Sequence, residues 1–247
     1  MLQRCLVLLV CLGGLWVATA RADPQSDMQR VKRAVAAIVP GVAPTSIRPS
    51  PVAGLYEVTL GPQLFYVSAD GRYLVEGDVI DLRTHSNITT ARRDVARIKA
   101  INAVGTDHMI VYSPAHPRHT ITVFTDIDCA YCRKLHREVG ALVKAGIRVR
   151  YLFYPRSGLD TPSYYKAVSV WCAPDRKQAL ETAEAGGALP RRTCKNPVKQ
   201  QMALGDVIGV RGTPTIVLGD GSIVPGYLPA AKLVEVVDGL GAQSSGG

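Results

Sequence analysis

The sequence predicts a mixed α/β chain in two parts, a small N-terminal α+β domain and a larger α/β domain, joined by a helix. Three observations support this division. Residues 23–86 contain short β-rich segments and one segment with helical spacing, and residues 87–108 contain a single helical pattern. Residues 109–247 alternate between strand and helix patterns, with a helix-leaning insertion at about 156–207.

Residues 1–22 have the features of a secretory signal and are not expected to belong to the fold. Arg4 precedes an apolar run, and Ala20-Arg21-Ala22 fits the small-x-small cleavage rule. We place cleavage after Ala22, with Ala20 as the alternative. A retained membrane anchor is the competing interpretation, but the run is shorter than the ~20 residues that span a bilayer. The chain is therefore expected to be exported.

Charge and cysteine content narrow the class of protein further. The predicted signal carries two arginines and no acidic residue, so its removal lowers the formal charge from +9 to +7. The basic residues are scattered and no aromatic residues alternate with them, which argues against nucleic-acid binding. An even number of cysteines in the mature chain suits an oxidising compartment. These are Cys129, Cys132, Cys172 and Cys194.

Residues 23–86 are predicted to form a small domain with one helix and several strands. Strand patterns occupy residues 55–60, 64–67 and 73–75. The helical spacing before them is carried by Met28, Val31, Val35 and Ile38. A domain of ~60 residues is marginally stable, and its sheet edges need a cover. Self-association is one way to supply that cover.

Residues 89–103 are predicted to form the connecting helix. Thr89 or Thr90 can cap its start, and Gly105 can end it. One face is expected to consist of Ala91, Val95, Ile98 and Asn102. The opposite face is rich in arginine and lysine, as is typical of a solvated linker.

The larger part begins with a predicted βαβ unit, in which strands 120–125 and 147–154 flank helix 129–144. Strands 215–218 and 222–224 follow the insertion. The apolar face of a final helix is formed by Leu233, Val236, Val237 and Leu240. This order of strand, helix, strand, helical insertion, hairpin and helix is that of a thioredoxin fold.

The most informative segment is Asp126-Ile127-Asp128-Cys129-Ala130-Tyr131-Cys132, at the junction of strand 120–125 and the helix that follows it. Unpaired N–H groups and the helix macrodipole favour a thiolate at a helix N-terminus. A thiolate is the attacking species in disulfide exchange, and a second cysteine one turn later can resolve the mixed disulfide. We therefore predict Cys129 as an exposed catalytic nucleophile and Cys132 as a more buried resolving thiol.

Half a zinc site and a structural disulfide are the competing interpretations of this pair. Zinc needs a second pair of ligands at short spacing, and Cys172 and Cys194 are too far apart to supply it. His136 could reach the site, although a solvated helix residue is the simpler interpretation. No metal and no cofactor are expected.

Cys172 and Cys194 are predicted to form a structural disulfide within the insertion. Neither belongs to a Cys-x-x-Cys pair, and residues 185–192 between them have little apolar periodicity with which to pack. The competing interpretation is a second redox pair that relays electrons to Cys129. Neither cysteine has the helix N-terminal setting that lowers the pKa of a thiol.

Several motifs together give the sequence a family resemblance over nearly all of the mature chain. They are Ile121-Thr122-Val123-Phe124-Thr125-Asp126-Ile127, Cys129-Ala130-Tyr131-Cys132, Lys134-Leu135-His136, Trp171-Cys172-Ala173, Gly212-Thr213-Pro214 and Val224-Pro225-Gly226-Tyr227. With these motifs the chain resembles the DsbC/DsbG family of periplasmic thiol:disulfide interchange proteins. The resemblance implies a V-shaped homodimer held by the N-terminal domains, with a cleft that binds misfolded exported proteins. It also implies an inner-membrane reductant of the DsbD type.

The resemblance further implies that Thr213 and Pro214 lie beside the cysteine pair and bind substrate, with a cis bond between them. An ordinary trans proline is the alternative. Tyr131 is either a substrate contact or a surface aromatic. The chain departs from the best-known members at Ala130, at Asp128, which should oppose the thiolate, and at Arg133, which should favour it.

The function expected from the resemblance is that of a periplasmic disulfide isomerase or reductase. A DsbG-type thiol oxidase or sulfenic-acid reductase of narrower client range is the first alternative. A chaperone-like binding module whose thiols are incidental is the second.

Overall fold

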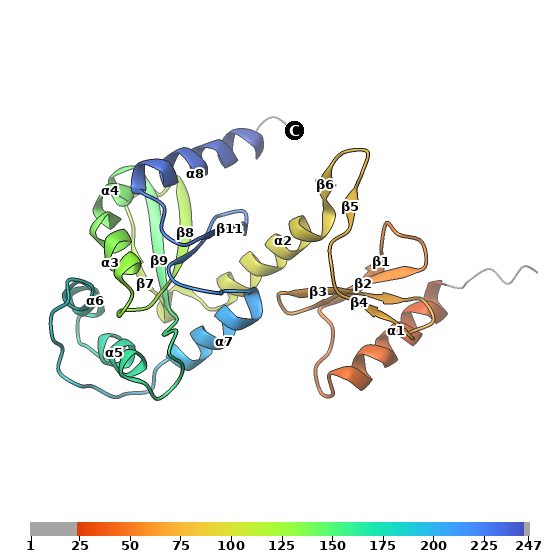
Figure 1. Cartoon of the computed structure of the whole chain (residues 1–247), viewed down its shortest axis with the longest axis horizontal. Coiled ribbons are helices and arrows are strands. Elements are labelled where there is room, and N and C mark those ends of the chain that lie inside the picture. Colours follow the sequence, from red (N-terminus) through yellow and green to blue (C-terminus); the bar gives the residue numbers. More distant parts are fainter. Residues whose placement is uncertain (1–23, 245–247) are drawn as a thin grey trace, which may run out of the picture.

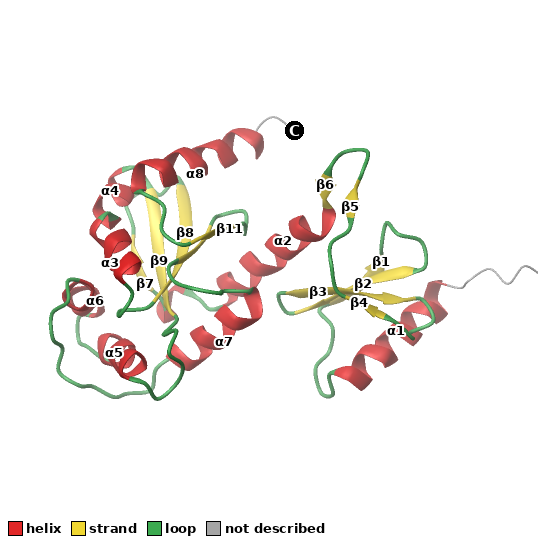
Figure 2. Cartoon of the chain, viewed as in Figure 1, coloured by secondary structure: helices red, strands yellow, loops and turns green. Residues whose placement is uncertain are grey.

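The computed structural model describes residues 24–244 (Figure 1). Two sheet-containing parts are joined by helix α2 (Ile88–Ala103), and helices and loops surround the larger sheet (Figure 2). The predicted signal at residues 1–22 lies outside the described residues. Within the described part of the chain, no helix combines the length and the apolar character needed to cross a membrane. The predicted limits of the domains stay a prediction.

The N-terminal part consists of helix α1 (Pro24–Ile38) packed on an antiparallel sheet with the strand order β1-β2-β3-β4. The strands are β1 (Ser46–Pro49), β2 (Leu55–Leu60), β3 (Gln63–Ser68) and β4 (Leu74–Val75). The small core between helix and sheet contains Val31, Val35, Tyr56, Val58, Phe65 and Val67. The helix and the three strands confirm the prediction, whereas β1 was not predicted. Because β4 is short and lies at the sheet edge, its side chains stay half exposed.

The start of helix α2 corrects the predicted cap. A two-stranded ribbon of β5 (Ile80–Asp81) and β6 (Ser86–Asn87) leads into the helix, and the Asn87 side chain accepts a hydrogen bond from the Thr90 N–H. Thr89 is fully buried instead, where its hydroxyl contacts Tyr66 and accepts from the Val79 N–H. Thr89 therefore ties the linker to the small sheet rather than capping the helix.

The face that α2 buries also differs from the prediction. Val95, on the predicted face, is 64% exposed, whereas Ile101 is fully buried in the larger part of the protein. Arg97 donates hydrogen bonds to the carbonyls of Ile208 and Gly221. Polar contacts thus orient the helix, and apolar spacing alone could not identify them. A Cβ added at Gly221 would lie 2.0 Å from the Asp94 carbonyl oxygen, so only glycine allows this close approach.

The larger sheet has five strands in the order β11-β10-β8-β9-β7. They are β7 (Ile110–Tyr112), β8 (His119–Thr125), β9 (Ile147–Phe153), β10 (Thr215–Val217) and β11 (Ile223–Pro225). Strands β8 and β9 are parallel, and the other neighbouring pairs are antiparallel. This sheet confirms the predicted thioredoxin-like fold. Only β7 was not predicted.

Both faces of this sheet are covered, as the alternation of its side chains requires. Helices α3 (Ala130–Arg137), α4 (Val139–Lys144) and α8 (Ala230–Ser244) cover one face, and α2 and α7 (Val198–Ile208) cover the other. The first face contributes Ile121, Val123, Val149 and Tyr151 to the main core, and the second contributes Phe124, Leu152 and Val217 to a smaller one.

The predicted helix 129–144 is two helices, because it is interrupted at Glu138. The Glu138 carboxylate accepts hydrogen bonds from the Tyr227 hydroxyl and from the Ala230 N–H. Tyr227 precedes α8, and Ala230 is the first residue of that helix. This contact fixes the end of the cysteine-bearing helix against the C-terminal part of the chain.

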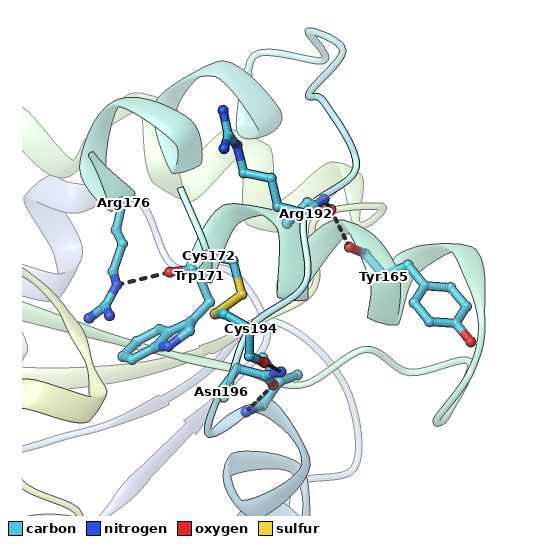
Figure 3. Close-up of a disulfide and its surroundings, with 9 residues drawn as sticks. Tyr165, Trp171, Cys172, Arg176, Arg192, Cys194 and Asn196 are labelled. Atoms are coloured by element: carbon cyan, nitrogen blue, oxygen red, sulfur yellow. Dashed lines mark hydrogen bonds between the residues drawn. A yellow bond between two sulfur atoms is a disulfide. The ribbon is translucent and has the colours of Figure 1, made fainter. Parts of the chain in front are cut away.

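The insertion contains helices α5 (Pro162–Trp171) and α6 (Arg176–Glu184), followed by a long loop that leads to α7. Cys172 follows the last turn of α5 and is bonded to Cys194 in that loop (Figure 3). Beside the bond, the Arg176 guanidinium lies over the Trp171 ring and donates to the Trp171 carbonyl. The disulfide therefore anchors a loop that has no helix or strand of its own.

We expect the double variant Cys172→Ala/Cys194→Ala to unfold more easily by roughly 3 kcal/mol, because the bond closes a loop across a separation of 22 residues. Urea unfolding of wild type and variant measures the difference. In the wild type, mild reductant should open a Cys129–Cys132 bond and leave this one closed. Mass spectrometry that finds both pairs reduced at one potential would contradict a structural role.

Candidate active site

The candidate site forms where the start of helix α3 meets the loop before strand β10. Cys129 is the N-cap residue of α3, and Cys132 lies in the first turn of that helix. The peptide bond between Thr213 and Pro214 is cis, and the Cys129 thiol donates to the Thr213 carbonyl oxygen at 3.1 Å. Both cysteines are free thiols. The fold thus brings together four of the residues that sequence reasoning selected, across 84 positions of the chain.

Cys129 is only 3% exposed, so the expectation of an exposed nucleophile was wrong. Its sulfur lies against Thr213 from the distant loop, a contact that no local pattern reveals. Cys132 is 1% exposed, as expected of the more buried member of the pair. Both sulfurs therefore depend on protein groups, rather than on water, for stabilisation of a charge.

Hydrogen bonds lower the pKa of Cys129. Burial by itself raises the pKa of this thiol, but the Thr213 side chain and the N–H groups of Cys132 and Tyr131 outweigh burial and hold the pKa below its ordinary value. Two of these donors are the free N–H groups of the first turn of α3. The helix start thus provides the thiolate stabilisation that the sequence predicted.

The pKa of Cys132 is shifted in the opposite direction. Burial raises the pKa of Cys132 to about 12, and hydrogen bonds from the Asp126 backbone, Thr125 and Thr213 offset burial only in part. The Thr213 hydroxyl is buried and has no hydrogen-bond partner at normal distance among the described residues. It therefore stands available to whichever sulfur is charged.

We expect iodoacetamide at pH 7 to label Cys129 at least about a hundredfold faster than Cys132, because the thiolate is the reacting species. Peptide mapping of the reduced native protein after timed quenching measures both rates. Labelling in denaturant, where the two environments are lost, is the control. Faster labelling of Cys132 in the native protein would reverse the two roles.

The charges of Asp128 and Arg133 affect the pKa of Cys129 less than the sequence suggested. The Asp128 carboxylate binds the Lys166 ammonium at 2.5 Å and lies 3.7 Å from the Arg133 guanidinium. Its charge is thus balanced by two cations, one of them on the insertion helix α5. Hydrogen bonds, rather than Asp128 and Arg133, dominate the lowered pKa of Cys129.

Asp126 is a structural residue of the site to which sequence reasoning assigned no role. Its carboxylate accepts from the Asp128 N–H, from the Ser163 hydroxyl and from the Arg156 guanidinium. Burial opposes its ionisation, but these bonds hold the pKa of Asp126 below its usual value. The carboxylate thereby joins the turn before Cys129 to the insertion. An acid three residues before a Cys-x-x-Cys loop was the available signal.

Two aromatic groups flank the site in different ways. Tyr131 is 62% exposed and stacks on Tyr227, with ring centroids 6.4 Å apart. The Lys134 ammonium lies over the Tyr227 ring, 4.5 Å from its centroid.

His136 is half-buried and hydrogen-bonded to the Tyr151 hydroxyl, and burial lowers the pKa of His136 to about 4. The interpretation of His136 as a solvated residue was therefore wrong.

An open cavity of about 630 Å³ borders the site between α3, α5 and the loop after α6. Its lining near the cysteines includes Ile127 and Arg133, and the insertion contributes Tyr165, Leu189 and Arg191. The mixed apolar and cationic lining suits a stretch of polypeptide. Among the residues that the structure describes, no cluster of three or more His, Cys, Asp or Glu side chains is suited to a metal ion.

Both parts of the chain match known protein families. Residues 106–240 match a family described as thioredoxin-like domain, and residues 18–90 match the disulfide bond isomerase protein N-terminal domain. The chain is 34% identical to the thiol:disulfide interchange protein DsbC of Escherichia coli over 222 residues, which cover 90% of this chain and 92% of that protein. It is 36% identical to DsbC of Dickeya dadantii, with 92% of each chain covered.

Among solved structures, a disulfide interchange protein from Neisseria gonorrhoeae aligns with a TM-score of 0.49 at 31% identity. The alignment covers 54% of this chain and 96% of that one.

Proposed function

Because the chain belongs to the DsbC family of thiol:disulfide interchange proteins, we propose that it rearranges incorrect disulfides in exported proteins through Cys129 and Cys132. The chain is a thiol-disulfide oxidoreductase by this membership. The observation that carries the assignment of roles is the contrast between the two thiols. One has its pKa lowered at a helix start, and its neighbour has its pKa raised by burial.

In the proposed cycle, the Cys129 thiolate attacks one sulfur of a client disulfide and forms a mixed disulfide, and the other client sulfur leaves as a thiolate. That thiolate can attack another disulfide of the client, after which a client thiolate displaces Cys129. The net change is isomerisation, with no electrons gained or lost by the enzyme. Alternatively, Cys132 attacks Cys129, and the client leaves reduced while the enzyme becomes oxidised.

Thr213, Pro214 and Tyr131 are the proposed client contacts. The Cys129 thiol donates to the Thr213 carbonyl, the Thr213 side chain stabilises a charge on either cysteine, and the exposed Tyr131 lies between the two cysteines in the chain. Attack requires a client strand to reach the Cys129 sulfur beside this loop. A client backbone could then use the Thr213 carbonyl that the resting thiol occupies.

The finer assignments of partners and location are also proposals. We place the protein in the periplasm, as a homodimer joined through its N-terminal domain, with an inner-membrane reductant of the DsbD type restoring the dithiol. The N-terminal family match supports the homodimer, and the signal features of residues 1–22 support export. The reductant is proposed from the family resemblance alone. The DsbG-type alternative would share the chemistry and differ in client range.

Recovery of a scrambled, multi-disulfide substrate tests the proposed function. The reduced protein should restore the activity of such a substrate, whereas the oxidised protein should do so poorly, because isomerisation begins with a Cys129 thiolate. Retention of full activity after Cys129→Ser would instead favour a binding module whose thiols are incidental.

A further inference from the structure

A buried carboxyl group on insertion helix α6 lies behind the cysteine pair. Glu184 is only 2% exposed, although carboxylates are rarely buried without a cation or several donors. Its Oε1 accepts a hydrogen bond from the Thr125 hydroxyl at 3.0 Å. Its Oε2 is buried and has no hydrogen-bond partner within the described part of the chain. An incompletely satisfied carboxyl in this position calls for an explanation.

Thr125 connects this carboxyl to the resolving cysteine. It is the last residue of strand β8, and it is fully buried. A hydrogen bond from its side chain favours the Cys132 thiolate. One hydroxyl thus adjoins both the Cys132 sulfur and the Glu184 carboxyl. A hydroxyl can accept one proton while it donates another, so it can pass a proton between two groups that do not touch.

Cys132 needs such a path because it is a poor acid in its own environment. It must lose a proton before it can attack the mixed disulfide, and it is 1% exposed to water. Burial also raises the pKa of Cys132 to about 12, so the free thiolate is scarce near neutral pH.

We propose that Glu184 accepts the Cys132 proton through the Thr125 hydroxyl when Cys132 resolves the mixed disulfide. This inference rests on the proposed function. The Thr125 oxygen takes the thiol proton as its own proton passes to Glu184. The Cys132 sulfur then bonds to the Cys129 sulfur, the bond from Cys129 to the client breaks, and the client leaves as a thiolate. One negative charge passes from Glu184 to the client sulfur, and no other electrons are required.

The reverse sequence serves reduction of the enzyme. When a thiol reductant attacks the Cys129–Cys132 bond at Cys129, Cys132 leaves as a thiolate. The protonated Glu184 can return its proton through Thr125, so the buried pair never holds two negative charges. Glu184 acts on the sulfur only through Thr125 and is therefore a positioning and relay residue.

The groups around Glu184 agree with this role. Burial raises its pKa to about 8, against the hydrogen bond from Thr125 and the charge of Arg133, both of which lower it. At pH 7 the ionised carboxylate that accepts the proton is therefore the minor form, about one molecule in ten, and its share rises towards pH 8. Asp126 raises the pKa of Glu184 but stays paired with Arg156.

The other titratable neighbours of Glu184 are not suited to accept the proton. Tyr112 on β7 and Tyr151 on β9 have pKa values raised by burial, so both stay neutral. His136, bonded to Tyr151, also stays neutral, because burial lowers its pKa. Helix α5, which packs on α6, carries Lys166, whose ammonium binds Asp128.

Reaction of the reduced protein with Ellman's reagent separates the two steps, because each step releases one coloured thiolate. The first release reports attack by Cys129 and depends on reagent concentration, and the second reports resolution by Cys132 and does not. We expect Glu184→Gln to leave the first rate within about twofold and to slow the second at least about tenfold at pH 7. The second rate should level off near pH 8 in the wild type and keep rising with pH in the variant.

A purely structural role of Glu184 predicts a faster second release in Glu184→Gln. If Glu184 were only a buried negative neighbour, its removal would ease ionisation of Cys132 and hasten the second release. A second rate that is unchanged or faster in Glu184→Gln therefore overturns the relay. Thr125→Val should reproduce the slow second release, and Thr125→Ser, which keeps the hydroxyl, should restore it. The double variant should be no slower than the slower single variant.

Glu181→Gln is the matched control, since Glu181 lies one turn earlier on α6 and is exposed. It should leave both rates unchanged. A normal first release in each variant shows that the fold and Cys129 are intact. If the wild type itself gives no first release, the proposed function fails; if only the second step is insensitive to Glu184, the relay alone fails.

Discussion

The Cys129→Ala variant is expected to lose disulfide exchange down to the uncatalysed rate, whereas Cys132→Ala should accumulate mixed disulfides between Cys129 and clients. With Cys129 absent, the remaining thiol is still buried, and burial is the main cause that raises the pKa of Cys132 in the wild type. Very few molecules would then carry a thiolate there at pH 7. With Cys132 absent, the first attack proceeds and the resolving attack on Cys129 cannot occur.

Non-reducing gels and mass spectrometry of protein recovered with an oxidised client measure the trapped species, and the scrambled-substrate assay measures activity. Cys172→Ala/Cys194→Ala is the control for loss of cysteines as such, and it should keep exchange activity under conditions where it is folded. Trapping by the Cys129→Ala variant, with no trapping by Cys132→Ala, would mean that the roles are reversed.

Strands that consist of a continuous run of β-forming residues were predictable from the sequence. Strand β2 occupies residues 55–60 as predicted, and β8 and β9 differ from the prediction by one residue each. Each of these strands is central in its sheet, so it is buried along most of its length, including polar residues such as Glu57, Thr122 and Arg150. The very short strands β1 and β7 contain too few residues to establish a period.

Features that depend on distant residues were not predictable in this way. The break between α3 and α4 is associated with Glu138 bonding to Tyr227 and Ala230, about 90 positions later in the chain. Cys129 was expected to be exposed because a helix N-terminus by itself is open to water, and its burial follows from contact with Thr213.

Dependence on distant residues also decides which residues of the candidate site could be predicted from the sequence. Cys129 and Cys132 follow from spacing and from the helix that they begin. Thr213 and Pro214 entered only through resemblance to a family. Thr125 and Glu184 have no local signature at all, because a glutamate in a polar helix is ordinarily a solvated residue. Only the packing of α6 behind α3 makes it a buried neighbour of the thiols.

A fragment of residues 87–247 is expected to be a folded monomer that keeps thiol reductase activity and loses most isomerase activity. It should include helix α2, because Ile101 is fully buried with Met109 and Phe124 in the core of the larger part. Asn87 supplies the cap of that helix. The two cysteines and the Thr213 loop are all retained, so reduction of a small disulfide should proceed at a rate close to that of the full chain.

Isomerisation also requires that a scrambled client be held while its disulfides are exchanged. The N-terminal part is small, and strand β4 at its sheet edge has Leu74 and Val75 more than 40% exposed. Pairing with a second copy would cover this edge. The full chain should therefore be a dimer in light scattering, and a dimeric fragment would contradict an interface in residues 24–86.

A full-length variant separates loss of the dimer from loss of the domain. Val75→Lys places a charge on the edge strand at a side chain that is 44% exposed, where it opposes pairing with a second copy. It should shift the full chain towards the monomer and lower isomerase activity while reductase activity is kept. If this monomer isomerised as well as the wild type, the N-terminal domain would serve client binding directly rather than through assembly.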